Sequence, residues 1–146
     1  MNILCVAAVE DRTNLDAQIL KQTVAPNRTV FYVDPTPAHG IENRRRRIAE
    51  NQDKLKEIVE AYKPDFVWQL EGDCELPEDC LERLIGRYIQ YGERNFGYVS
   101  GIQVGRHGLY CIGAWRVARD RQKFESIDHT LTGVQQIDAT GFYCLL

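Results

Sequence analysis

Short apolar runs alternate with longer amphipathic stretches along the first half of the chain. Ile3–Val9 is apolar almost throughout, which is the pattern of a strand covered on both faces in an α/β sheet. Thr29–Val33 is β-branched and aromatic, and Phe66–Leu70 is again mostly apolar. The pattern predicts three strands, with Ile3–Val9 in a central position.

Apolar residues at helical spacing lie between these predicted strands. We expect one helix over Asn14–Val24 and a long one over Ile41–Tyr62, ended by Lys63-Pro64. The long helix has an apolar stripe of Ile48, Leu55, Ile58, Val59 and Tyr62. A third helix is expected to begin at Pro77 and to bury Leu81, Leu84, Ile85 and Tyr88.

Three more strands are expected, over Gly97–Val104, Leu109–Val117 and Ile137–Leu146. Strands and helices that alternate in this way indicate one α/β domain over residues 1–146 with an open, largely parallel sheet. Such sheets bind ligands beyond the carboxyl ends of their strands, so the loops after Val9 and Leu70 and the one after Thr29–Val33 are the places to examine.

Composition narrows the choice of function. The chain has 146 residues, 44% hydrophobic and 27% charged, with a net charge of −3, which excludes disorder and gives no general attraction to nucleic acid. The apolar run at the N-terminus is too short for a signal peptide or a membrane span, so a cytoplasmic location is expected. Five scattered cysteines indicate reduced, mostly buried thiols.

An acidic cluster follows the third predicted strand. Its members within twelve residues are Glu71, Asp73, Glu75, Glu78, Asp79 and Glu82. Alternation in an extended segment would put Glu71 and Asp73 on one side, and Gly72 would allow a close backbone approach. Such oxygen ligands suit Mg²⁺ or Mn²⁺, which could hold a diphosphate. The last three acids are instead typical of a solvated first helical turn.

The segment Phe66–Leu84, FVWQLEGDCELPEDCLERL, resembles the part of GT-A fold glycosyltransferases, near family two, in which an apolar strand delivers a DxD motif. Tyr98–Gly101 and Ile137–Leu146 are similar to later strands of that family. The resemblance implies a three-layer α/β/α fold with a mostly parallel mixed sheet. It also implies a metal-dependent enzyme that transfers sugar from a nucleotide-diphosphate sugar to an acceptor hydroxyl, on a sugar or a protein not identified by the sequence.

The resemblance assigns the Mn²⁺ or Mg²⁺ ligand to Asp73, with Glu71 in place of the first Asp of the motif. It further implies that Asp34 contacts the base, that Val9 and Glu10 wall the base and ribose, and that the Gly141 turn lies close to the donor sugar.

The run of four arginines at 44–47 has two interpretations. Arg44 and Asn51 share a helix face with Leu55, and family members often have an Arg and an Asn there near the nucleotide. The alternative is an exposed, salt-bridged helix face.

The catalytic base is not identified in the chain. The resemblance places it beyond Ile137–Leu146, so we expect a longer protein, and Asp138 is only a weak candidate. The apolar residues at 143–146 would form an exposed strand edge, which predicts self-association to a homodimer.

Two alternatives stay open. A sugar-nucleotide nucleotidyltransferase would share the sheet and the metal, but the loop after Val9 is not the Gly-rich basic loop that this class uses. A non-catalytic binding or assembly module would keep the fold without the base.

Overall fold

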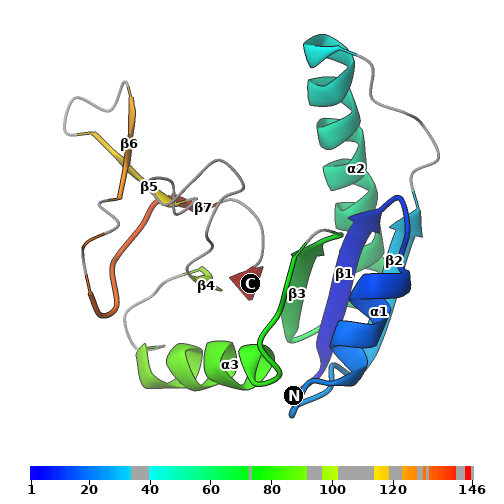
Figure 1. The fold of residues 1–146 in the computed structure, drawn as a ribbon, viewed down its shortest axis with the longest axis horizontal. Coiled ribbons are helices and arrows are strands. Elements are labelled where there is room, and N and C mark those ends of the chain that lie inside the picture. The colour runs from blue at the N-terminus through cyan, green and yellow to red at the C-terminus, as the bar shows by residue number, and fades with distance from the viewer. Residues whose placement is uncertain are drawn as a thin grey trace.

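The computed structural model shows an α/β protein built around a small, largely parallel sheet (Figure 1). It describes residues 1–33, 40–72, 74–91, 97–101, 114–118, 123–127, 130, 132–140 and 144–145. No helix among these residues is long and apolar enough to cross a membrane.

The main sheet has five strands in the order β2-β1-β3-β8-β4. Its strands are β1 (Ile3–Val9), β2 (Arg28–Val33), β3 (Phe66–Glu71), β4 (Val99–Ser100) and β8 (Cys144–Leu145). β2 and β3 each pair with β1 in parallel, whereas β8 runs antiparallel between β3 and β4. The parallel arrangement expected from the alternating strands and helices is confirmed for β1, β2 and β3.

A second, three-stranded antiparallel sheet has the order β6-β5-β7. It consists of β5 (Ala114–Val117), β6 (Phe124–Ser126) and β7 (Ala139–Thr140). The prediction of one strand over Ile137–Leu146 is therefore wrong, because β7 and β8 lie in different sheets. The predicted strands over Gly97–Val104 and Leu109–Val117 are represented by β4 and β5, and most of their other residues lie outside the described part of the chain.

Helices cover both faces of the main sheet, and this explains why β1 is apolar at successive positions. One face of β1 packs against α1 (Thr13–Leu20) and α3 (Cys80–Tyr91), in a core cluster that also holds Trp68 and Leu70. The other face places Leu4 and Val6 against Leu55 of α2 (Ile41–Tyr62). Figure 1 shows α1 and α2 on opposite sides of the sheet. Both faces of β1 are thus buried, as predicted.

Two of the three helices, α1 and α3, differ from their predicted bounds. α2 has the predicted bounds and ends at Lys63, which adopts the left-handed conformation that commonly stops a helix. α1 ends at Leu20, because the next two N–H groups bond three residues back and tighten the turn, and Leu20 is exposed. α3 begins at Cys80, after a turn from Pro77. The apolar stripe of α3 is buried as predicted.

The C-terminal strand does not form the exposed edge that the sequence suggested. Trp68 of β3 pairs with Leu145 of β8, and Leu145 pairs on its other side with Val99 of β4. The expectation that residues 143–146 offer an uncovered edge is wrong for β8, since its backbone is hydrogen bonded to a strand on each side.

Three thiols are buried in the core cluster, and none of them forms a disulfide. Burial raises the pKa of Cys5 to about 12, although a hydrogen bond with Thr29 opposes the shift. Burial likewise raises the pKa of Cys80 to about 11 and that of Cys74 above its usual value. These cysteines behave as small hydrophobic residues, as expected.

We expect stability to decline in alkaline solution because of these thiols. The unfolded chain releases thiol protons above about pH 9, whereas folded Cys5 keeps its proton up to about pH 12. The free energy of unfolding should therefore fall as pH rises through this range, by about 1.4 kcal/mol per pH unit for each protonated thiol. Urea unfolding at several pH values measures the slope. Cys5→Ala should be less stable at pH 8 and have a shallower slope, and an unchanged slope would contradict this account.

Candidate functional site

The carboxyl ends of the three parallel strands meet at one edge of the main sheet. Val9 of β1 is aligned with Val33 of β2, and Ala8 is aligned with Glu71 at the end of β3. The residue after β1 is the exposed Glu10. The loops following all three strands therefore begin side by side, which is where open α/β sheets bind ligands.

Gly72 brings the loop after β3 close to the end of β1. A Cβ atom at Gly72 would lie 3.0 Å from Cγ1 of Val9, so a larger residue would have to displace this buried side chain. The Cys74 N–H donates to the Glu71 carbonyl at 3.2 Å, so the chain turns directly after β3. β3 therefore ends at Glu71. Asp73 itself lies outside the described residues.

The N-terminal half of α2 contributes polar side chains to this edge. Nη2 of Arg47 lies 3.1 Å from Oε1 of Glu10, although the two residues are 37 positions apart in the sequence. One turn further along α2, Asn51 is half-buried. Gln69 of β3 donates to Gln52 of α2 at 3.2 Å. We refer to the polar residues near this edge, Glu10, Arg47, Asn51, Gln69 and Glu71, as the strand-end cluster.

Arg47 is the arginine that reaches this cluster, not Arg44. The side chain of Arg47 is 23% exposed, whereas Arg44 is exposed, so Arg44 agrees with the exposed-face interpretation and not with a place beside the nucleotide. Ile48, predicted to be in the apolar stripe, is 50% exposed. Arg47, Asn51 and Leu55 follow one another at intervals of four, so they share one face of α2. The exposed-face interpretation suits Arg46, which is paired with Glu50 on the same helix.

Gln18 of α1 and Gln22, two residues after the end of α1, hold the acidic segment after β3. The side-chain amide of Gln18 donates to the Cys74 carbonyl at 3.0 Å and accepts from the Leu76 N–H at 2.6 Å. Gln22, which is buried, donates to the Pro77 carbonyl at 2.8 Å and accepts from the Leu81 N–H at 3.2 Å. Three backbone groups of the irregular segment and one N–H in the first turn of α3 are thereby satisfied by these two amides. The sequence analysis missed both glutamines.

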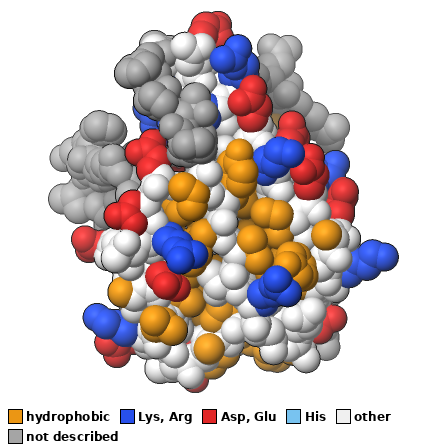
Figure 2. Space-filling view, turned by 90° about the vertical axis from the view of Figure 1, so that its right-hand side faces the viewer, with side chains coloured by type: hydrophobic (Ala, Val, Ile, Leu, Met, Phe, Trp, Pro, Cys, Tyr) orange, Lys and Arg blue, Asp and Glu red, His pale blue; other side chains and the backbone are white. Residues whose placement is uncertain are grey.

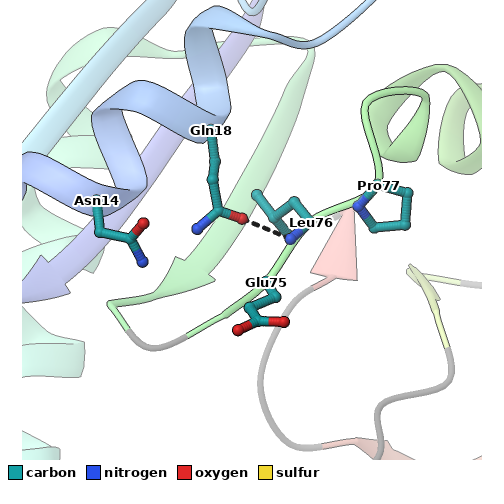
Figure 3. Close-up of a pocket in the computed structure, with 5 residues that line it drawn as sticks. All are labelled: Asn14, Gln18, Glu75, Leu76 and Pro77. Carbon is teal, nitrogen blue, oxygen red and sulfur yellow. Dashed lines mark hydrogen bonds between the residues drawn. The ribbon is translucent and has the colours of Figure 1, made fainter.

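An open depression lies between α1 and this segment (Figure 3). Its volume is about 540 Å³, and Asn14, Gln18, Glu75, Leu76 and Pro77 line it. Asn14 and Glu75 are exposed, and Figure 3 shows the Gln18 side chain reaching the Leu76 backbone. Asn14 belongs to the first turn of α1 and Glu75 follows the turn after β3, so the depression adjoins the strand ends.

The other predicted site residues lie elsewhere. Asp138 precedes β7 in the three-stranded sheet, where its Oδ2 accepts a hydrogen bond from the Val117 N–H at 2.8 Å. Asp138 is exposed and tethers β5 through this bond. Asp34 and Gly141 lie outside the described residues. Of the predicted residues that the structure describes, Val9, Glu10 and Glu71 lie at the ends of β1 and β3, and Asn51 is half-buried on α2, one turn after Arg47.

The metal site predicted at Glu71 and Asp73 has only one of its members in the described part of the chain. Within that part, no three His, Cys, Asp or Glu side chains gather as a ready metal site. Mg²⁺ is commonly held by one or two carboxylates with substrate phosphates and water completing its shell. Glu71, half-buried at the end of β3, has the oxygen chemistry of such a ligand.

Comparison with known proteins identifies no relative of this chain. No protein-family model, no curated protein and no solved structure matches it. The chemistry of its side chains and their positions in the fold are therefore the basis for a proposed function.

The glutamine contacts give a prediction about stability. Gln18→Ala leaves the Cys74 carbonyl and the Leu76 N–H without their partner, and we expect it to lower the free energy of unfolding by about 1 to 3 kcal/mol. Asn14→Ala changes an exposed side chain of the same helix and should stay within about 0.5 kcal/mol of the original. Urea denaturation measures both variants. Equal stabilities for the two would show that Gln18 does not hold the segment.

Proposed function

We propose that this chain is the donor-binding portion of a metal-dependent glycosyltransferase of the GT-A type. The observation that carries the proposal is the strand-end cluster: near the carboxyl ends of parallel strands, α2 contacts Glu10 after β1 through Arg47 and Gln69 of β3 through Gln52. The donor would be a nucleotide-diphosphate sugar, and the acceptor hydroxyl would belong to a sugar or a protein.

The sheet supports this proposal at the level of topology. A five-stranded sheet with one antiparallel strand and helices packed on both faces is compatible with the three-layer α/β/α arrangement of GT-A enzymes. The acidic turn directly after β3 is where the DxD-like sequence would be delivered. Proteins with this kind of fold also have other functions, so the proposed function rests on the strand-end cluster and not on the sheet.

Mg²⁺ or Mn²⁺ would be held by Glu71 and Asp73, with the donor diphosphate completing its shell. When bound, the metal would neutralise the charge that develops on the leaving diphosphate. Two hard carboxylates without sulfur or imidazole are the donor set that these cations prefer. The buried thiols of Cys74 and Cys80, kept protonated by their raised pKa values, would not compete for the cation.

The rest of the cluster would orient the nucleotide. Val9 and Glu10 would wall the base and ribose, with Asp34 reaching the base from the end of β2. The guanidinium of Arg47 would donate hydrogen bonds to a phosphate of the nucleotide, and Asn51 would form a hydrogen bond with the nucleotide beside it. The Gly141 turn would lie against the sugar. A carboxylate base from outside this set would take the proton of the acceptor hydroxyl.

Metal-dependent nucleotide binding tests the proposal directly. We expect UDP or GDP to bind in calorimetry with Mn²⁺ or Mg²⁺ present and to lose affinity when a chelator is added, because the diphosphate would otherwise face Glu71 and Asp73. Asp73→Asn should abolish the metal-dependent part of binding and leave the melting temperature without metal nearly unchanged, since it removes one crowded carboxylate.

Glu82→Gln is the matched control, because Glu82 belongs to the same acidic segment but is exposed and contacts Thr23. Its effect on nucleotide affinity should stay within a few-fold, since solvent screens its charge over a Debye length of about 8 Å. If Glu82 were needed and Asp73 were not, the acidic segment would be a docking surface and the binding-module alternative would replace the enzyme.

Arg47 provides a second test. Arg47→Gln should weaken nucleotide binding about ten-fold, because a charge-assisted hydrogen bond to phosphate is lost. Arg45→Gln removes an exposed guanidinium of the same helix and should leave affinity within about two-fold. The pair between Arg47 and Glu10 is partly exposed, so Arg47→Gln should cost under about 1 kcal/mol of stability. Equal binding by both variants would remove Arg47 from the site.

A further inference from the structure

β2 is an outer strand of the main sheet, and no described strand pairs with its far side. Its six residues carry a single charge, that of Arg28 at the first position, and no proline. Edge strands of natural proteins are usually protected by charges, proline or bulges against pairing with another chain. β2 has no charged residue or proline over Thr29–Val33, so this edge strand is suited to pairing with a further strand.

The hydrogen bonds of β1 determine which backbone groups of β2 are available. The Ile3 carbonyl accepts from the Asn27 N–H at 3.0 Å on the β2 side, and the Asn2 carbonyl accepts from the Phe66 N–H at 3.1 Å on the β3 side. With Leu4 aligned to Arg28, the even-numbered residues of β2 turn their backbone groups toward β1. The outward N–H and C=O groups belong to Thr29, Phe31 and Val33.

We propose that β2 pairs antiparallel with β2 of a second copy of this chain, with Phe31 on the two-fold axis. In this register Phe31 faces Phe31 of the second copy, and Thr29 faces Val33 of the second copy at both ends. All outward groups are then used, in three hydrogen-bonded pairs. A shift by two residues in either direction loses one pair, so the strand is self-complementary in one register.

Charge and side-chain chemistry favour a second copy in this orientation. Antiparallel pairing puts the two Arg28 side chains at opposite ends of the joint, and each guanidinium is already stacked on Tyr62 at 4.1 Å. The intervening pairs join Val30 to Tyr32, and contacts between aromatic and β-branched side chains stabilise adjacent strands. Figure 2 shows apolar side chains gathered on this side of the molecule, with some charged side chains among them and others around them.

The flanking helix fits the same two-fold arrangement. α2 begins near the carboxyl ends of the strands, where Arg47 meets Glu10, and ends near the start of β2, where Tyr62 covers Arg28. Ile48 is 50% exposed and Tyr62 is 37% exposed. Antiparallel pairing exchanges the two ends, so Ile48 of each copy comes to the end where Tyr62 of the other lies. An exposed aliphatic side chain and an exposed aromatic one thereby come to the same end of the joint on each side of the axis.

Sedimentation equilibrium of the full chain, from about 1 μM to about 1 mM, tests the proposal. The original chain should dimerise. Val33→Lys places a charge in each of two symmetric pairs and should weaken dimerisation at least about ten-fold, whereas Val33→Thr keeps a β-branched residue and should dimerise nearly as the original. A chain that stays monomeric throughout, or one that Val33→Lys does not affect, overturns the proposal.

Cross-linking tests the register itself. Residues facing each other in a hydrogen-bonded antiparallel pair have Cα atoms about 5.5 Å apart, within the range of a disulfide. The double variant Thr29→Cys/Val33→Cys should form covalent dimers on mild oxidation, and each single variant should not. If either single variant formed covalent dimers as readily as the double variant, the proposed register would be overturned. The proposal does not depend on the proposed function, since nucleotide binding is measured separately.

Discussion

Everything in this fold depends on the burial of β1. The strand is covered by α1 and α3 on one face and by α2 on the other, and it is paired with β2 and β3 along both edges. A strand enclosed in this way can carry no polar side chain until it ends, so the first charged residue, Glu10, comes directly after Val9. In β3 the buried positions 67, 68 and 70 are likewise apolar, and the polar residues Gln69 and Glu71 take the partly exposed positions near its end. Burial of the sheet is therefore what collects polar groups at one edge.

The supporting contacts explain how an irregular acidic segment can be held beside that edge. Its backbone cannot join a sheet or a helix before α3 begins, so its polar groups need other partners. Gln18 of α1 and Gln22, just after α1, supply them, and Leu15 and Ile19 beside Gln18 anchor α1 in the core. The position of the segment is thus determined by a helix that packs on β1. Gly72 completes the arrangement by allowing contact with Val9.

Sequence patterns predicted the parts of the structure that local burial decides. β1 and α2 have their predicted bounds, because a continuous apolar run and a long amphipathic repeat each carry their own signal. The split of Ile137–Leu146 between two sheets was not visible, since pairing partners far away in the sequence decide it. Arg47 was missed because four consecutive arginines look alike until α2 is placed on β1. The glutamines were missed because an amide that bonds to a distant backbone leaves no pattern in the sequence.

The position of β2 links the strand-end cluster to the proposed dimer. An edge strand with one neighbour has backbone hydrogen bonds on only one side, so its end is held less firmly than the end of β1 or β3. A second copy bonded to Thr29, Phe31 and Val33 would restrain β2 up to its last residue. The next residue is Asp34, which would contact the base under the proposed function. Restraining this end before the nucleotide arrives would reduce the ordering entropy lost on binding, so the two proposals together imply tighter nucleotide binding by the dimer than by the monomer.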